Sequence, residues 1–450
     1  AAWLARQVGR GVAGRDTGRP APASYRGLEL RPIAVPLLCG GSAPGFVERV
    51  AEVLEGSGLA PVPGATAGSV EGATQLAPGS AVGVQFVGGD VSWTATGTVT
   101  HIEDDRLLAF GHSLFGAGRV ELPMVGASVH AVLPLQSVSF KYASGTDLVG
   151  TLVEDRNRMV AGVLGPPPPT MPLELHVSSD GGGERDFEFD VVRSKWYAPT
   201  FGGLAVASAV TEALRLSGAA SAVIDVEVTV GGSAIEYRNM LDTASPAFRV
   251  GGEVGTLLDF ILLNDFEEQT VERVRVDVAV RDGRRSATIE RATTDRRVYC
   301  PGDTIRLSVG LSSWQGEEEE LAAELPIPVS ATPGELVLRV GGASEYHEWE
   351  AERLGDGLKP RSFEQLVGLI ERTRPENTVV AQLLSDEVGV SLSGNELRAV
   401  PGRAALAMAR SATSGTVVKT EGRVLAQAEM EYDRVVAGFH EIRVIIVTRR

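Results

Sequence analysis

The segment around His112 carries the residue types best suited to acid–base chemistry. It reads Leu108-Ala-Phe-Gly-His112-Ser-Leu-Phe-Gly116, and the run Arg106–Phe110 predicts a strand that leads straight into Gly111 and His112. A glycine beside the histidine lets the backbone turn sharply and leaves the imidazole near the surface. Because imidazole titrates near neutral pH, a histidine at a strand end can act as a general base. A surface histidine, or one hydrogen-bonded for structural reasons, is the alternative interpretation.

The other histidines and the serines give weaker signals. His101 lies near Glu103, Asp104 and Asp105, but without a second histidine at ligand spacing a solvated turn is favoured over a metal site. Four further histidines each stand alone in the sequence: His130, His176, His347 and His440. Several serines precede glycine without forming a G-x-S-x-G turn, among them Ser144, Ser217, Ser393 and Ser414. The chain also lacks a P-loop, a dinucleotide fingerprint and a Cys-x-x-Cys pair, so no cofactor and no metal are predicted.

The composition of the chain limits the classes of partner that the protein can bind. The net charge of −16 argues against nucleic acid, which is bound by clustered Lys and Arg, and against adsorption to anionic lipid. No apolar run approaches the roughly 18 residues that span a membrane. The start of the chain, 1–22, has no apolar core of a secretion signal, and it does not begin with Met, which indicates a processed product or part of a longer protein. Cys39 and Cys300 could be unpaired core residues or could form one bridge.

Several elements are expected before residue 200. A helix is indicated by Phe46, Val50, Val53 and Leu54 on one face, stopped by glycines 56 and 58, and a loop is expected over 61–79. Val91–Thr100 alternates in the manner of a half-buried strand with a threonine outer face. Further strands are expected at 106–110, 129–133 and 148–153. After a polyproline break at 166–169, strands 173–177 and 187–192 form one hairpin.

Apolar and polar residues alternate more regularly in the second half of the chain. A helix is predicted over Gly203–Leu216 and a strand over Val223–Val230. From about residue 250, strands at 274–280, 305–311 and 336–340 suit a β-sandwich. Glu317–Glu320 is interpreted as a solvated loop, because a calcium loop spaces its ligands around a turn. Ser362 with Gln365 predicts a capping box, and the chain ends in a strand containing Ile442, Val444 and Ile446.

The motifs within 76–165, taken together, are more informative about protein family than any one of them alone. It contains Leu76-Ala-Pro-Gly-Ser, Ala95-Thr-Gly-Thr-Val-Thr-His, Leu108-Ala-Phe-Gly-His112, Gly150-Thr-Leu-Val-Glu-Asp-Arg and Ala161-Gly-Val-Leu-Gly165. This resembles the SpoIVB-type serine peptidases, named for stage IV sporulation protein B, and is most similar to the envelope members of non-sporulating bacteria. The resemblance implies a chymotrypsin-like pair of β-barrels and serine endopeptidase activity outside the cytoplasm. His112 matches the general base of the family's G-T-x-T…G-H signature.

The chain departs from that family at its nucleophile. The G-M-S-G-S-P element, its nearby acidic residue and the peptide-binding PDZ module of the family are not found in these 450 residues. In the envelope members the nucleophile element is expected upstream of a segment like Arg31–Leu38, so this chain is expected to begin after it. Without a nucleophile, a histidine cannot form an acyl-enzyme.

The predicted architecture is mainly β, with five regions. These are a flexible leader (1–26), a peptidase-like β-barrel region (27–200), a helix–strand connector (201–250), an Ig-like β-sandwich (251–345) and a C-terminal α+β region (346–450). Two functions follow. The first is part of an extracytoplasmic serine endopeptidase, in the periplasm or cell envelope, that acts on a protein or peptide. The second is a noncatalytic envelope scaffold that binds other envelope proteins and retains a peptidase-like barrel.

Overall fold

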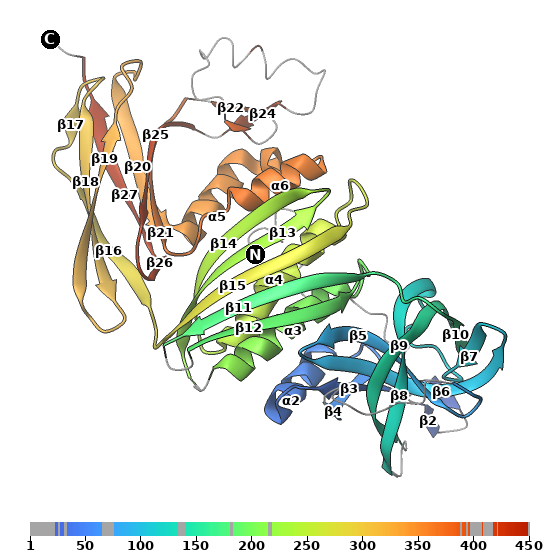
Figure 1. Ribbon diagram of the computed structural model, residues 1–450. Coiled ribbons are helices and arrows are strands. Elements are labelled where there is room, and N and C mark those ends of the chain that lie inside the picture. Colours follow the sequence, from blue (N-terminus) through green and yellow to red (C-terminus); the bar gives the residue numbers. More distant parts are fainter. Residues whose placement is uncertain are drawn as a thin grey trace.

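The computed structural model is mainly β, as the sequence predicts, with helices packed on one of its sheets (Figure 1). It describes residues 23–25, 28–30, 34–64, 76–133, 140–180, 183–214, 218–387, 389–392, 395–396, 407, 417–420 and 422–448. Most of the expected leader, all of 65–75 in the expected loop, and Ser217, Ser393 and Ser414 lie outside the described residues.

Six consecutive strands close into a ring. They are β5 (Ala81–Gly89), β6 (Ser92–Glu103), β7 (Arg106–Ala109), β8 (Gly118–Leu133), β9 (Phe140–Arg156) and β10 (Met159–Leu164). Their neighbours run β5-β8-β9-β10-β7-β6, and an additional β5–β6 pairing closes the ring. Every pairing is antiparallel, and β8-β5-β6-β7 has the spatial order of a Greek key. A closed antiparallel barrel therefore holds the segment with His112.

The threonine face of β6 differs from its prediction. Ser92, Thr94 and Thr96 are buried rather than solvent-facing. The reason is barrel closure: β9 lies across the ring from β6, and a Cβ on Gly145 would come within 2.9 Å of Thr94 Oγ1. The opposite face of β6 is also covered, since the Trp93 ring lies near Phe46 and Phe201.

The N-terminal part contains β1 (Ala23–Tyr25), β2 (Leu28–Leu30), β3 (Val35–Gly40), α2 (Pro44–Val53) and β4 (Leu59–Gly64). Strands β3 and β4 extend the barrel sheet from β6, whereas β1 and β2 form a separate two-stranded sheet. The predicted helix is confirmed, whereas β4 occupies the start of the expected loop. Cys39 is buried and both cysteines are free thiols, so they form no bridge. Burial raises the pKa of the Cys39 thiol to about 12.

The middle of the chain is a second layered unit. The hairpin of β11 (Thr170–Ser179) and β12 (Gly183–Val192) forms as predicted, after the proline segment. It is followed by α3 (Ala198–Ala213), β13 (Ala220–Val230), β14 (Ser233–Thr243), α4 (Pro246–Leu262) and β15 (Val271–Asp282). These strands continue the barrel sheet in the order β14-β13-β15-β11-β12, joined to it where β12 pairs with β5. Helices α3 and α4 pack against one face (Figure 1).

Two predictions for this unit are wrong. The chain does not turn to strands at residue 250, because α4 spans Pro246–Leu262. The strand with Val274–Val280 was expected in the sandwich, but β15 instead lies between β11, to which it is parallel, and β13. The alternation of Val274, Val276 and Val278 is the same in either sheet, so it could not select the partner. The predicted helix Gly203–Leu216 is present but begins earlier, at Ala198, and ends at Ala213.

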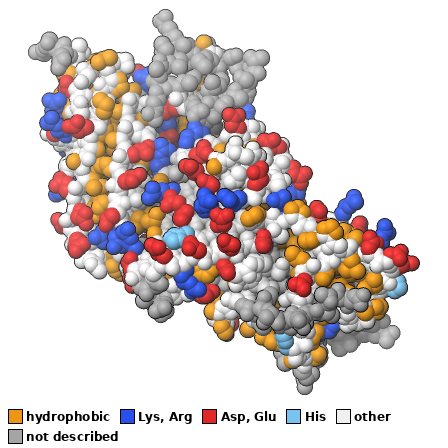
Figure 2. Space-filling view, viewed as in Figure 1, with side chains coloured by type: hydrophobic (Ala, Val, Ile, Leu, Met, Phe, Trp, Pro, Cys, Tyr) orange, Lys and Arg blue, Asp and Glu red, His pale blue; other side chains and the backbone are white. Residues whose placement is uncertain are grey.

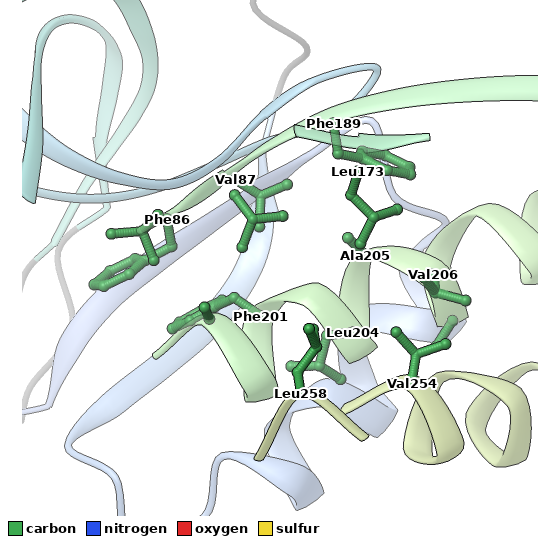
Figure 3. Close-up of a cluster of buried hydrophobic side chains, with 14 of the residues drawn as sticks. Phe86, Val87, Leu173, Phe189, Phe201, Leu204, Ala205, Val206, Val254 and Leu258 are labelled. Carbon is green, nitrogen blue, oxygen red and sulfur yellow. The ribbon is translucent and has the colours of Figure 1, made fainter. Parts of the chain in front are cut away.

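Glycines bring α3 and α4 into close contact. A Cβ on Gly203 would come within 2.6 Å of Gly251 O, and a Cβ on Gly255 within 2.8 Å of Pro199 O. The helix backbones therefore touch, and α3 is almost wholly buried between α4, the sheet and the barrel. Figure 3 shows Phe201, Leu204 and Leu258 in this core, with Phe86 of the barrel beside Phe201. The Phe86 and Phe201 rings stack with centroids 4.3 Å apart, which joins the barrel to the helical layer.

Nine of the strands that the structure describes after β15 form a two-sheet sandwich. One sheet is β19-β18-β16-β26 and the other is β17-β27-β20-β21-β25, and buried residues from both share one core. The strands are β16 (Ser286–Thr294), β17 (Val298–Tyr299), β18 (Thr304–Ser313), β19 (Glu318–Pro326), β20 (Gly334–Gly342), β21 (Thr378–Ser385), β25 (Arg423–Glu431), β26 (Val435–Ala437) and β27 (Phe439–Ile446). The final predicted strand, β27, thus pairs with β20 inside this sandwich.

Glu317–Glu320 is not a loop throughout. Glu318, Glu319 and Glu320 begin β19, the edge strand of the first sheet, and their side chains are exposed. Charged side chains on an edge strand discourage pairing with other chains. The glutamates are therefore exposed to solvent, as expected, but three of them lie in a strand rather than in a loop.

Helices α5 (Ala343–Leu354) and α6 (Phe363–Glu371) lie between the sandwich and the sheet on which α3 and α4 pack (Figure 1). The 3-10 turn η1 (Gly355–Leu358) follows α5 in the chain. A small sheet, β22 (Gly389–Leu392), β23 (Asn395–Glu396) and β24 (Val417–Thr420), lies beyond these helices. The predicted cap is confirmed, since Ser362 Oγ accepts from Gln365 N. Gln365 Oε1 accepts from Arg361 N, one residue before the cap. None of the helices in the described residues is both long and apolar enough to cross a bilayer.

His347 on α5 should make the fold sensitive to acid. It is buried, its Nε2 accepts a hydrogen bond from Arg374 N at 3.1 Å, and burial with the charge of Arg374 lowers its pKa to about 3. An unfolded histidine titrates near 6.5, so the stabilisation is present above that pH and is lost as pH falls toward 3. Between pH 7 and pH 5 we expect the wild type to lose about 2 kcal/mol more stability than His347→Gln. Urea unfolding at both pH values measures this, and equal losses in the two proteins would contradict it.

Candidate active site

The backbone before His112 makes an unusual turn. Strand β7 ends at Ala109, and both Phe110 and Gly111 then take positive φ values, 69° and 74°. A left-handed φ is costly for a bulky residue such as phenylalanine and persists only where the surroundings enforce it. Here Phe110 N donates to Thr98 O at 3.0 Å and Gly111 N to Ala109 O at 2.9 Å. The turn is therefore held by one bond to the neighbouring strand β6 and by one bond back to its own strand, β7.

Gly97 explains why two parts of the sequence signature occur together. A Cβ at this position would lie 2.5 Å from Phe110 Cγ, so the Phe110 ring packs directly on the Gly97 backbone. The Gly-Thr pair of the Ala95–His101 segment thus positions the Phe-Gly-His segment that follows the next strand. Gly97 gives the ring its space, and the carbonyl of Thr98 holds the Phe110 backbone.

The His112 imidazole is half-buried at the end of this turn. Its Nδ1 lies 2.8 Å from Ser113 O. A carbonyl oxygen can only accept, so Nδ1 carries a proton, and in the neutral imidazole Nε2 then keeps its lone pair. Among the residues that the structure describes, no serine hydroxyl is hydrogen-bonded to His112. The arrangement supplies a proton acceptor on a preformed turn, and the described residues do not place a nucleophile on it.

The loop after His112 is anchored in two ways. Asp155 of β9 is 1% exposed, and its carboxylate accepts N–H bonds from Leu114, Phe115 and Ala117. The Phe115 ring stacks on Tyr197 with centroids 4.7 Å apart, and both rings meet Phe86 edge-on. Burial, with the nearby charge of Asp155, raises the pKa of Tyr197. The loop next to the imidazole is therefore held in one position, and a catalytic base requires such support.

The structure brings together one serine–histidine pair that the sequence did not predict. Ser144 Oγ lies 2.8 Å from His130 Nε2, between adjacent strands β9 and β8. Their separation of 14 residues around a hairpin carries no local signal. Ser144 is only 2% exposed, whereas His130 is exposed. Because a peptide carbonyl cannot reach a buried hydroxyl, this pair does not form a competent nucleophile in the observed conformation.

The other predicted candidates do not assemble into a site. His101 is exposed on β6, and His176 pairs with Asp186 at 2.7 Å on the surface, which raises the pKa of His176. In the part of the chain that the structure describes, no group of three His, Cys, Asp or Glu side chains is placed to hold a metal ion. Figure 2 shows acidic and basic side chains interspersed across the middle of the molecule. Arg275 of β15 pairs with Glu174 of β11 at 3.3 Å, and both side chains are well exposed to solvent.

Comparisons with family models, with curated proteins and with solved structures found no match to this chain. They therefore identify no family. Only its own residues and geometry bear on its function.

The Gly97–Phe110 contact can be tested directly. Gly97→Ala should push the Phe110 ring away and lower the free energy of unfolding by about 1–3 kcal/mol, since overpacking a filled site is destabilising. Gly45→Ala is the matched control: its Cβ would meet nothing within 4 Å, and Gly45 lies in α2. Alanine in a helix is favoured over glycine by roughly 0.5–1 kcal/mol, so the two substitutions should have opposite signs. Urea denaturation of both variants checks this, and an unchanged Gly97→Ala protein would contradict it.

Proposed function

We propose that this chain is part of an extracytoplasmic serine endopeptidase of the SpoIVB type, with His112 as its general base. The nucleophilic serine is contributed by residues outside these 450. The observation that carries the proposal is the turn at 110–112. A strained backbone, a glycine that receives the Phe110 ring and a buried carboxylate all hold one half-buried imidazole in place. Strain of this kind is concentrated at functional sites.

The architecture supports the same proposal. A six-stranded antiparallel Greek-key ring is what one barrel of a chymotrypsin-like peptidase would provide. His112 follows the third strand of this ring, β7, and stands at a strand end where a second barrel could approach. The chemistry of such an enzyme requires the base on one rigid element and the nucleophile on another.

The reaction assigned to His112 follows from its free nitrogen. Nε2 would take the proton of the serine hydroxyl as the serine oxygen bonds to the peptide carbonyl carbon. It would then give that proton to the leaving amine as the C–N bond breaks. Water then attacks the acyl-enzyme carbonyl carbon as Nε2 accepts a proton from it. The ester C–O bond breaks, and Nε2 returns that proton to the serine oxygen. Ser113 O holds Nδ1–H and so keeps Nε2 as the acceptor.

A noncatalytic envelope scaffold is the second candidate. It is favoured by the burial of Ser144, which leaves the one serine–histidine pair of the described residues without access to substrate. In this alternative the two-sheet sandwich, proposed to be Ig-like, serves as a protein-contact module beside an inactive barrel.

A fluorophosphonate probe, which bonds to activated serine hydroxyls, separates the candidates by intact mass. We expect no adduct on the 450-residue chain and an adduct on a product extended upstream, lost in His112→Ala. An adduct on the 450-residue chain at Ser144 would overturn the external nucleophile. If neither protein is labelled, the peptidase proposal fails and the scaffold stands.

A further inference from the structure

Asp155 and His112 contact opposite sides of one peptide group. Ser113 and Leu114 share the peptide bond whose carbonyl oxygen lies 2.8 Å from His112 Nδ1. The N–H of the same group, on Leu114, donates to Asp155 Oδ1 at 2.7 Å. No cis peptide bond occurs in the described residues, and in a trans peptide the C=O and N–H point in opposite directions. The order of groups is therefore imidazole, peptide, carboxylate.

The carboxylate is built into the barrel rather than attached to its surface. Asp155 lies near the end of β9, paired with Gly118 of β8 on one side and Val160 of β10 on the other. Its second oxygen, Oδ2, accepts from Phe115 N at 2.8 Å and Ala117 N at 3.2 Å. Three charge-assisted bonds thus fix the loop that follows His112, and such bonds are about twice as strong as neutral ones.

We propose that Asp155 is an acidic positioning residue for His112, distinct from the acidic residue that the family carries near its nucleophile, and that it acts through the Ser113–Leu114 peptide group rather than by touching the imidazole. Its charge polarises that peptide, since hydrogen bonds in a chain strengthen one another. The polarised Ser113 carbonyl then holds the proton on Nδ1, leaves Nε2 basic, and favours the imidazolium that forms during catalysis. The catalytic consequence rests on the proposed function, but the effect on the imidazole does not.

The structural half of the test uses the 450-residue chain and needs no activity. Nitrogen-15 NMR of labelled histidine distinguishes which ring nitrogen carries the proton, and His112→Ala assigns one of the six histidine signals. The neutral His112 should carry its proton on Nδ1 in the wild type. In Asp155→Asn, which keeps the side-chain shape, the Nε2–H form should rise to at least half of the population.

Glu154→Gln is the matched control, because it removes a neighbouring carboxylate that instead pairs with Arg156 at the surface. It should leave the His112 signal unchanged. An unchanged His112 signal in Asp155→Asn would overturn the proposal. So would a wild-type His112 protonated mainly on Nε2, a result that requires no variant to fold.

The catalytic half uses the upstream-extended product. Asp155→Asn should lower kcat by about 100-fold, the scale of a small misplacement of a catalytic group, with little change in KM. Glu154→Gln should retain wild-type values. A kcat that does not fall would overturn the catalytic role of Asp155. If the wild-type extended product is inactive while the NMR shift is observed, the proposed function fails and the peptide-mediated contact stands.

Discussion

Replacing His112 by alanine in the upstream-extended protein is expected to lower kcat/KM for a peptide substrate by about 10²–10⁴-fold, the contribution of a general base. The loss should appear mainly in kcat, because the imidazole acts on the serine proton in the transition state and adds little to substrate binding. The stability of the variant should stay close to that of the wild type, since the His112 side chain is only half-buried.

His130→Ala is the informative control for this experiment. It removes a second imidazole of the same barrel, the one whose Nε2 lies 2.8 Å from the Ser144 hydroxyl. Its kcat/KM should remain near the wild-type value, because Ser144 is buried away from substrate. The opposite pattern, an inactive His130→Ala and an active His112→Ala, would place the catalytic base at His130 instead of His112.

Arg353→Met is expected to destabilise the C-terminal half by about 3–5 kcal/mol, as found when one partner of a buried ion pair is removed. The Arg353 side chain is 4% exposed and bonds Glu350 of α5 at 2.9 Å and Glu396 of β23 at 3.0 Å. Burial alone would lower the pKa of Arg353, but the two carboxylates outweigh it and raise that pKa. Removing the guanidinium leaves both carboxylates buried without their cation.

Arg443→Met provides the comparison. Arg443 pairs with Glu335 at 2.9 Å, but both side chains are more than half exposed. Such pairs contribute about 0–1 kcal/mol, so this variant should unfold close to the wild type. Urea unfolding of the two variants measures the difference. A loss below about 1 kcal/mol for Arg353→Met would mean that the buried network does not stabilise the α5 region.

Local patterns in the sequence predicted elements whose burial is decided within one hairpin or one helix. The β11–β12 hairpin, the cap at Ser362 and the helix at Phe46 follow from alternation, capping chemistry and periodicity. The same reasoning missed α4, whose glycines weaken a helical signal. Gly251 and Gly255 are placed there because the α3 backbone lies against them, a contact that no local pattern can show.

The features of the candidate site likewise fall into two groups, those that local sequence predicts and those that tertiary contacts decide. The sequence alone determined that a strand would deliver His112 to a glycine turn, because residue type and order set those local preferences. Only the tertiary structure decided what holds the imidazole. Barrel closure brings Asp155 to Leu114, 41 residues away, and buries the hydroxyl face of β6. Such contacts depend on which strands become neighbours, and alternation is the same for every choice of neighbour.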